Sequence, residues 1–110
     1  MMATSIYSYI WEYSVKEEYL DHFEHIYGPD GDWVKLFKLG EGHIATELHR
    51  DTDNPLRFVT VDHWTSKEAR NKFKKQFKQE YGDLDKQCES FTESEKFLGN
   101  FDCYSTKEHF

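Results

Sequence analysis

The chain has 110 residues, of which 37% are hydrophobic and 17% aromatic, and its formal net charge is −7. This length predicts a single domain over residues 1–110, whose core depends on a few large rings. The acidic charge argues against nucleic acid or an anionic membrane as a partner. No stretch approaches the ~20 apolar residues of a membrane span, residues 1–11 lack the pattern of a signal peptide, and two cysteines fit a reducing compartment, so we expect a cytoplasmic protein.

The first half of the chain predicts a strand, a helix and a short second helix. Residues 5–15 alternate with a period of two, which is typical of a half-buried strand. Residues 16–27 carry an apolar stripe at helical spacing, and the turn residues 28–31 end that helix. An aspartate before Trp33 can cap a short helical segment over residues 33–39.

Two further strands follow. Residues 43–50 and 56–64 alternate in the same way as the first strand, and both are rich in β-branched or aromatic residues. They flank the polar turn 51–55, which predicts a hairpin.

A long helix follows the third strand without a break. Thr65 and Ser66 supply N-cap chemistry, and Glu68 occupies the position that a capping box requires. Apolar residues then recur at steps of three and four as far as Cys88, so one helical face is apolar. With a closing strand over residues 96–104, the order is β-α-(short α)-β-β-α-β. This order predicts an α+β, ferredoxin-like split βαβ fold with a four-stranded antiparallel sheet.

The two faces of the predicted sheet differ in character. Aliphatic pairs on three strands suit contact with helices: Ile6 and Ile10, Ile44 and Leu48, Val59 and Val61. The opposite face then carries aromatic and polar residues: Tyr7, Tyr9, Trp11, Tyr13, His43, Glu47, His49, Phe58, Thr60, Asp62 and Trp64. That face is too aromatic to be left in water and too polar for an ordinary core. We therefore expect it to face a second copy of the sheet in an isologous homodimer, a dimeric α/β barrel.

Four segments carry a resemblance to a known family. They are YIWEYSV in the first strand, YGPDGDWVKLF, GHIATEL, and VDHWTS at the end of the third strand with the helix after it. Over about residues 5–102 the chain resembles the antibiotic-biosynthesis monooxygenase superfamily of dimeric α/β-barrel proteins, and within it a subgroup of small members. The resemblance implies this fold. The reactions that the resemblance implies as candidates are cofactor-free oxidation of aromatic polyketides, quinol oxidation and haem degradation.

The resemblance also bears on single residues. The family's tryptophan at the end of the third strand maps onto Trp64, which implies that Trp64 lines the pocket; the alternative is packing at the dimer interface. Haem-degrading members carry an asparagine on the first strand and a histidine on the long helix, ten residues after the tryptophan. Here the first strand has no asparagine and the helix position is Lys74, which argues against haem degradation.

Three residues are candidate catalytic groups, namely Asp62, Glu47 and His49. We expect them on one face of the sheet, around an apolar cavity, where a carboxylate could deprotonate a phenol. Burial raises the pKa of a carboxyl towards neutrality, where a general base works best. The alternative is an ion pair of Glu47 or Asp62 with His49 or Arg57 at the rim of the interface.

Five aromatic residues are candidates for substrate binding: Trp64, Trp11, Tyr9, Tyr13 and Phe58. Their rings could stack on a flat substrate, and the phenols could donate hydrogen bonds to a developing oxyanion. The alternative is plain packing, since aromatic residues are common in strands.

No metal site is expected. His22 and His25 lie three residues apart on the first helix, but without an obvious third ligand they fit a solvated helix face better. The leading hypothesis is a cofactor-independent monooxygenase or oxidase, without metal, haem or flavin, that acts on a small aromatic or quinol-type molecule in a pocket between the sheet and the helices at the dimer. The alternatives are a non-catalytic module that binds or senses a small ligand, and an aromatic face that only holds the dimer together.

Overall fold

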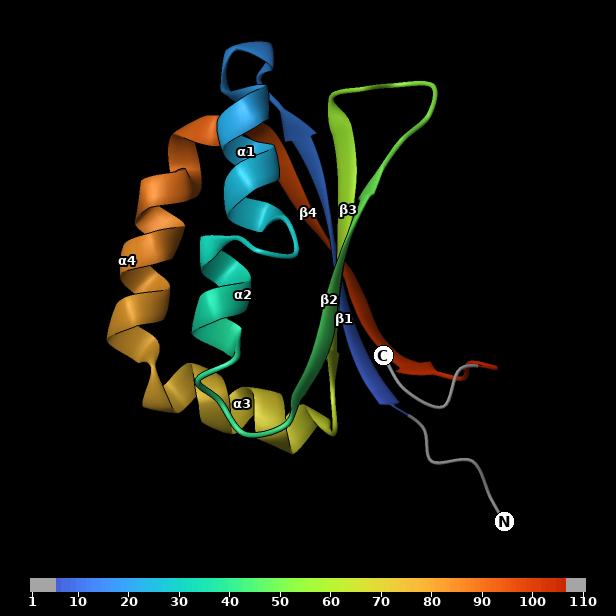
Figure 1. The fold of residues 1–110 in the computed structure, drawn as a ribbon, viewed down its shortest axis with the longest axis vertical. Helices are drawn as coiled ribbons and strands as arrows, with labels where there is room; N and C mark the ends of the chain where they lie inside the picture. Colours follow the sequence, from blue (N-terminus) through green and yellow to red (C-terminus); the bar gives the residue numbers. More distant parts are fainter. Residues whose placement is uncertain (1–5, 107–110) are drawn as a thin grey trace.

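One antiparallel sheet organises the computed structural model, which describes residues 6–106. Its strands are β1 (Ile6–Val15), β2 (His43–Arg50), β3 (Arg57–Trp64) and β4 (Thr92–Cys103), in the spatial order β2-β3-β1-β4. The helices are α1 (Leu20–Tyr27), α2 (Asp32–Phe37), α3 (Lys67–Gln76) and α4 (Lys78–Cys88), with 3-10 turns at Glu17–Tyr19 and Glu89–Phe91. All of these helices lie on the same side of the sheet (Figure 1). The predicted ferredoxin-like α+β arrangement is confirmed.

The closing strand is longer than the sequence predicts. β4 begins at Thr92 rather than at residue 96, and Val15 on β1 pairs with Thr92. A ladder needs only backbone N–H and C=O groups, so a polar, hydroxyl-rich stretch can continue an edge strand. The extension places Glu95 opposite Tyr13, where it reaches the space beneath the helices.

The predicted long helix is two helices. Ser66 is its N-cap, with Oγ accepting a hydrogen bond from the Ala69 N–H at 3.0 Å. At Phe77 the backbone leaves the helical region (φ −107°, ψ 32°), and α4 turns away from α3 (Figure 1). The apolar stripe continues across the break, because Phe73 contacts both Phe77 and Tyr81, with ring centroids 5.4 and 6.5 Å apart. Neither glycine nor proline marks this break in the sequence.

The aromatic face of the sheet lies beneath the chain's own helices, so the prediction that it faces a second subunit is wrong. Tyr13 packs on Phe23 and Tyr27 of α1, with centroids 5.3 and 5.1 Å apart. Trp64 is only 1% exposed and packs on Phe73 of α3. The reason is that rings bury more apolar area than Ile and Val, and the helices themselves present rings that interlock with them.

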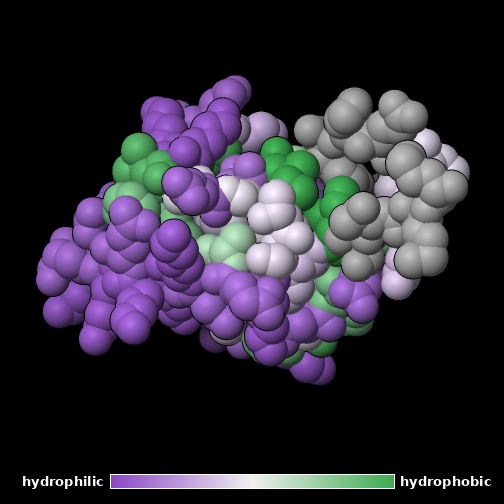
Figure 2. Space-filling view, turned by 90° about the horizontal axis from the view of Figure 1, so that it is seen from below, coloured by the Kyte–Doolittle hydropathy of each residue, from purple (hydrophilic) through white to green (hydrophobic). Residues whose placement is uncertain are grey.

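The helices within residues 6–106 do not cover the opposite face of the sheet, which we call the open face (Figure 1). Ile10 on β1 and Val59 and Val61 on β3 lie on it and are half-buried. Figure 2 shows that hydrophilic residues predominate over the helical side and that hydrophobic patches lie near the middle of the view. No helix within residues 6–106 is long and apolar enough to cross a membrane.

Candidate functional site

A cavity of about 260 Å³ lies between the sheet and the helices of the single chain. Rings from β1, α1, α2 and α4 form most of its wall: Tyr9, Trp11, Tyr13, Tyr27, Trp33, Phe37 and Tyr81. The polar lining residues are Thr46, Thr60, Asp62, Lys74, Asp85 and Glu95. A mostly aromatic cavity with a few converging polar groups is the usual form of a small-molecule site.

Asp62 is the buried carboxyl of this cavity. It lies in the middle of β3, directly opposite Tyr9 on β1 and Thr46 on β2, and is 7% exposed. The Thr46 hydroxyl donates a hydrogen bond to Asp62 Oδ1 at 2.8 Å. Burial raises the pKa of Asp62 to about 7, although the Thr46 hydrogen bond and the charge of Arg70 act in the opposite direction. At neutral pH both protonation states are therefore populated, as a general base requires.

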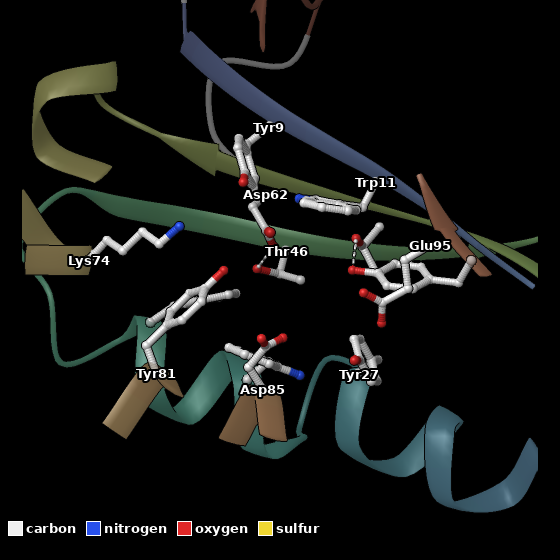
Figure 3. A pocket seen from close by; sticks show the side chains of 13 residues that line it. Tyr9, Trp11, Tyr27, Thr46, Asp62, Lys74, Tyr81, Asp85 and Glu95 are labelled. Atoms are coloured by element: carbon white, nitrogen blue, oxygen red, sulfur yellow. Dashed lines mark hydrogen bonds between the residues drawn. The ribbon is translucent and has the colours of Figure 1, made fainter. Parts of the chain in front are cut away.

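Three tyrosines of the wall are poor candidates for a base. Burial raises the pKa of Tyr13 and Tyr27, and it raises the pKa of Tyr81 to about 12. These phenols stay protonated at neutral pH, so Asp62 is the better candidate for accepting a proton. Figure 3 shows Tyr9 and Trp11 on the sheet side of the cavity and Tyr81 on the helix side.

Two cationic side chains come from α3. The guanidinium of Arg70 lies 3.6 Å from the ring centroid of Tyr9, and Arg70 is 9% exposed. Lys74 lines the cavity, with Nζ 5.0 Å from the Tyr81 ring centroid, and burial lowers its pKa. These cations favour negative charge on a bound ligand. Lys74 occupies the helix position, ten residues after Trp64, at which the resemblance implies a histidine in haem-degrading proteins.

Acidic groups lie at another part of the wall. Glu95 on β4 and Asp85 on α4 both line the cavity. Burial raises the pKa of Glu95, and the charge of Asp85 adds to that effect. Neither residue was predicted from the sequence as part of the site, and the same holds for Thr46, Tyr27, Trp33, Phe37, Tyr81 and the nearby Arg70. The only signal for Tyr81 was its place in the apolar stripe of the predicted helix.

Four of the predicted site residues line the cavity: Asp62, Tyr9, Trp11 and Tyr13. Two others lie in the core beside it. Trp64 is enclosed by Phe37 and Phe73, with centroids 5.9 and 5.1 Å away. Phe58, 2% exposed, packs on Phe23 at 5.0 Å.

Glu47 and His49 lie on the open face, so the prediction that they share a face with Asp62 is wrong. Glu47 is opposite Val61 in the register, and its two carboxylate oxygens lie 2.8 Å from His49 Nε2 and 3.3 Å from His63 Nε2. The error has one cause. Alternation placed Glu47 and His49 with His43, but a register shift between His43 and Ala45 puts Thr46, and not Glu47 or His49, on the side of Asp62.

Comparison with known proteins places the chain in a family. Among solved structures, it is similar to SnoaB from Streptomyces nogalater, a cofactor-independent oxygenase, with a TM-score of 0.76 and 15% identity over 96% of this chain and 99% of that one. It is also similar to a nipsnap family protein from Agrobacterium tumefaciens (TM-score 0.69, 9% identity, 99% and 97% covered). A third is a conserved protein from Methanosarcina mazei (TM-score 0.68, 11% identity, 89% and 92% covered).

These identities show a shared fold and no more. A search of curated protein sequences found no match. The family model for antibiotic biosynthesis monooxygenase matches residues 6–78, about two thirds of the chain, which spans β1 to α3 and includes Asp62 and Trp64. The chain therefore belongs to the antibiotic biosynthesis monooxygenase family.

Proposed function

We propose that this protein is an oxygenase that uses no cofactor and oxidises a small, electron-rich phenol or hydroquinone in the cavity beneath its helices. The observation that carries the proposal is Asp62, a buried carboxyl with a pKa raised to about 7 in a wall of aromatic rings. Membership of the family supports the reaction class. The description of SnoaB as a cofactor-independent oxygenase agrees with it.

The chemistry follows from ionising the substrate. The Asp62 carboxylate accepts the phenolic proton, and the phenolate then gives one electron to O₂. The resulting phenoxyl radical and superoxide combine at the para carbon, which forms a C–O bond. Asp62 returns its proton to the peroxide, and cleavage of the O–O bond with loss of the ring proton to the departing oxygen releases water and leaves a quinone. One oxygen atom of O₂ enters the product and the other leaves as water, so no external reductant is needed.

The cavity wall fits the other needs of this reaction. Tyr9 and Trp11 offer ring faces for stacking on a flat substrate. Arg70 and Lys74 place positive charge near the developing phenolate, which lowers the cost of forming it. The buried positions of Asp62 and Arg70 strengthen the effect of these charges.

The test is oxygen uptake with 1-naphthol, a phenol with a free para carbon, and its methyl ether as the matched control. We expect uptake and 1,4-naphthoquinone formation with the phenol and none with the ether, because the ether has no proton for Asp62 to accept. The rate above the protein-free background should rise with pH and be half-maximal near pH 7, where Asp62 ionises.

A different outcome would favour the second candidate function. If 1-naphthol raises the melting temperature but no oxygen is consumed with it or with a panel of hydroquinones, the cavity belongs to a non-catalytic ligand-binding module. The mostly aromatic wall of the cavity is the observation that supports such a module.

We also propose a homodimer that packs through the open face. Support comes from the half-buried Ile10, Val59 and Val61 on this face and from Phe101 on the edge strand β4, which is 46% exposed. A large apolar surface that a monomer leaves in water marks an association site. The partner therefore covers the side of the sheet opposite to the cavity.

Ile10→Lys is expected to give a monomer with an intact fold. Ile10 lies on the central strand β1, so a lysine there would bury a charge in the interface and weaken association roughly 30-fold or more. The control is Leu39→Lys, since Leu39 is 63% exposed and lies off the sheet. Light scattering after gel filtration should find twice the 13.2 kDa chain mass for wild type and Leu39→Lys, and the single mass for Ile10→Lys. A monomeric wild type would disprove the dimer.

A further inference from the structure

A β-bulge at the start of β2 joins three side chains on the cavity side of the sheet. His43 pairs with Trp64 and Ala45 with the adjacent residue His63, so Ile44 is an extra residue in the ladder. Without the bulge, residues 43 and 46 would point to opposite faces of the strand. With it, His43 Nε2 lies 2.9 Å from Thr46 Oγ1, and the Thr46 hydroxyl reaches Asp62 Oδ1 at 2.8 Å. Bulges that re-aim a side chain are common next to active sites.

The backbone before the bulge is fixed as well. Gly42 adopts φ +95°, a region that favours glycine, and its carbonyl accepts a hydrogen bond from the Thr65 N–H at 2.8 Å. A Cβ at Gly42 would come within 2.6 Å of Thr65 Oγ1 and 2.8 Å of Ala69 Cβ. The start of β2 is thus tied to the end of β3, and the position of His43 follows from that tie.

We propose that Thr46 and His43 are positioning residues for Asp62, which the bulge brings into one chain of hydrogen bonds behind the carboxyl. The inference depends on the proposed function for its catalytic meaning, because it assigns how the general base is held. The hydrogen-bonding capacity of each side chain fixes the direction of both hydrogen bonds. The single Thr46 hydroxyl proton goes to Asp62, so Thr46 must accept from His43, and His43 must carry its proton on Nε2.

The surroundings of His43 fit this role. Its ring lies against Trp64 and Phe37, with centroids 5.2 and 5.6 Å away. Burial lowers the pKa of His43 to about 4, and the charges of Lys38 and His63 add to this. His43 is therefore neutral at pH 7 and can donate through Nε2 without adding a charge to the cavity. Donors that polarise one another strengthen the hydrogen bond to a carboxylate.

The chain of hydrogen bonds decides which oxygen of Asp62 is available to the substrate. It holds Asp62 Oδ1, so Oδ2 is the oxygen that receives the substrate proton. It also stabilises the ionised carboxyl, which burial alone would suppress at neutral pH. The other charged or titratable groups that line the cavity are Tyr9 and Tyr13 on β1, Tyr27 on α1, Lys74 on α3, Tyr81 and Asp85 on α4 and Glu95 on β4, and Arg70 lies against the Tyr9 ring. All of these stay in place in the variants below.

The experiment follows the Asp62 carboxyl by ¹³C NMR during a pH titration of the ligand-free protein. Thr46→Val removes the hydroxyl at nearly constant volume and is expected to raise the Asp62 midpoint by about one pH unit or more. Thr46→Ser keeps the hydroxyl and should keep the midpoint. His43→Phe should raise it by less than Thr46→Val, while His43→Gln, which retains an N–H donor, should restore it.

The matched control is Thr60→Val. Thr60 lies on the same face of β3 and lines the same cavity, but its hydroxyl donates to Tyr13 at 3.4 Å rather than to Asp62. In Thr60→Val the titration midpoint of Asp62 should stay near that of wild type. If the Asp62 midpoint is the same in Thr46→Val and Thr60→Val, the positioning role of Thr46 is disproved.

The two proposals fail in different ways. If the Asp62 midpoint moves in Thr46→Val but wild type oxidises no phenol, the hydrogen-bond chain stands and the oxygenase function falls. If wild type oxidises 1-naphthol, the pH profile of kcat/KM should move upward in Thr46→Val together with the NMR midpoint. If the pH profile of kcat/KM does not shift in Thr46→Val, the positioning role of the hydrogen-bond chain is disproved, while the oxygenase function remains supported.

Discussion

Asp62→Asn is expected to abolish oxygen consumption and, above pH 7, to make the protein more stable. The loss of activity follows because an amide cannot accept the phenolic proton, and removal of a general base typically lowers turnover by about 10²–10⁴-fold. The gain in stability follows because wild type must bury a carboxylate at high pH. The asparagine oxygen can still accept the hydrogen bond from Thr46, so the replacement preserves the local geometry.

The size and pH range of the stability effect come from the raised pKa. The folded protein titrates Asp62 at about 7, against an ordinary value of 3.8. A raised carboxyl pKa contributes stability below about pH 4, and that contribution is lost as the pH rises through 7. At 1.36 kcal/mol per pH unit, the difference between variant and wild type should reach roughly 2–4 kcal/mol at pH 8 and vanish near pH 4.

His43 makes this experiment more informative. Its pKa is lowered, so it contributes stability at and above pH 6.5 that is lost as the pH falls towards 4. The contributions of Asp62 and His43 therefore change in opposite directions over nearly the same pH range in wild type. Asp62→Asn removes one of them, and the free energy of unfolding of the variant should then fall on acidification more clearly than that of wild type.

Urea unfolding at pH 5 and pH 8 measures these differences. The control is Asp51→Asn in the exposed turn, because the pKa of Asp51 is lowered, chiefly by the hydrogen bond from the Asp53 N–H. That substitution should destabilise the protein at neutral pH, in the direction opposite to Asp62→Asn. Equal stability of Asp62→Asn and wild type at pH 8 would show that Asp62 is not a desolvated carboxyl, and retained turnover would exclude it as the base.

Within β1 and β3 the sequence predicted which residues share a face, but it did not predict which face the helices cover or which residues of β2 join it. Alternation grouped Tyr9, Trp11 and Asp62 correctly, and the register places Tyr9 opposite Asp62. Period-two patterning defines two sides of a strand without naming them. The assignment then rested on the idea that helices prefer aliphatic contacts, whereas here Phe23, Phe37 and the other helix rings pack on rings of the sheet.

The rest of the site depends on features that leave little trace in one sequence. The bulge at Ile44 changes the orientation of His43, and no glycine or proline at that position announces it. The break at Phe77 directs α4 so that Tyr81 and Asp85 reach the cavity. Both are outcomes of packing between distant segments, and local propensity does not record them.

Trp64→Ala is expected to destabilise the whole protein rather than to alter the cavity alone. The indole is 1% exposed and contacts Phe37, His43 and Phe73. Removing a buried tryptophan costs about 3–5 kcal/mol, a large part of the roughly 5–15 kcal/mol that holds a domain folded. The melting temperature should fall by roughly 15 °C or more, and Trp64→Phe should recover much of the loss.

Trp11→Ala gives the matched comparison, because Trp11 is half-buried and forms part of the cavity wall. Its melting temperature should stay close to that of wild type, while the stabilisation that 1-naphthol confers should be largely lost. Thermal unfolding of both variants with and without 1-naphthol separates the two roles. If Trp64→Ala instead keeps its melting temperature and loses only the response to 1-naphthol, then Trp64 belongs to the substrate site, as the family resemblance implied, and the cavity must extend to it when a ligand binds.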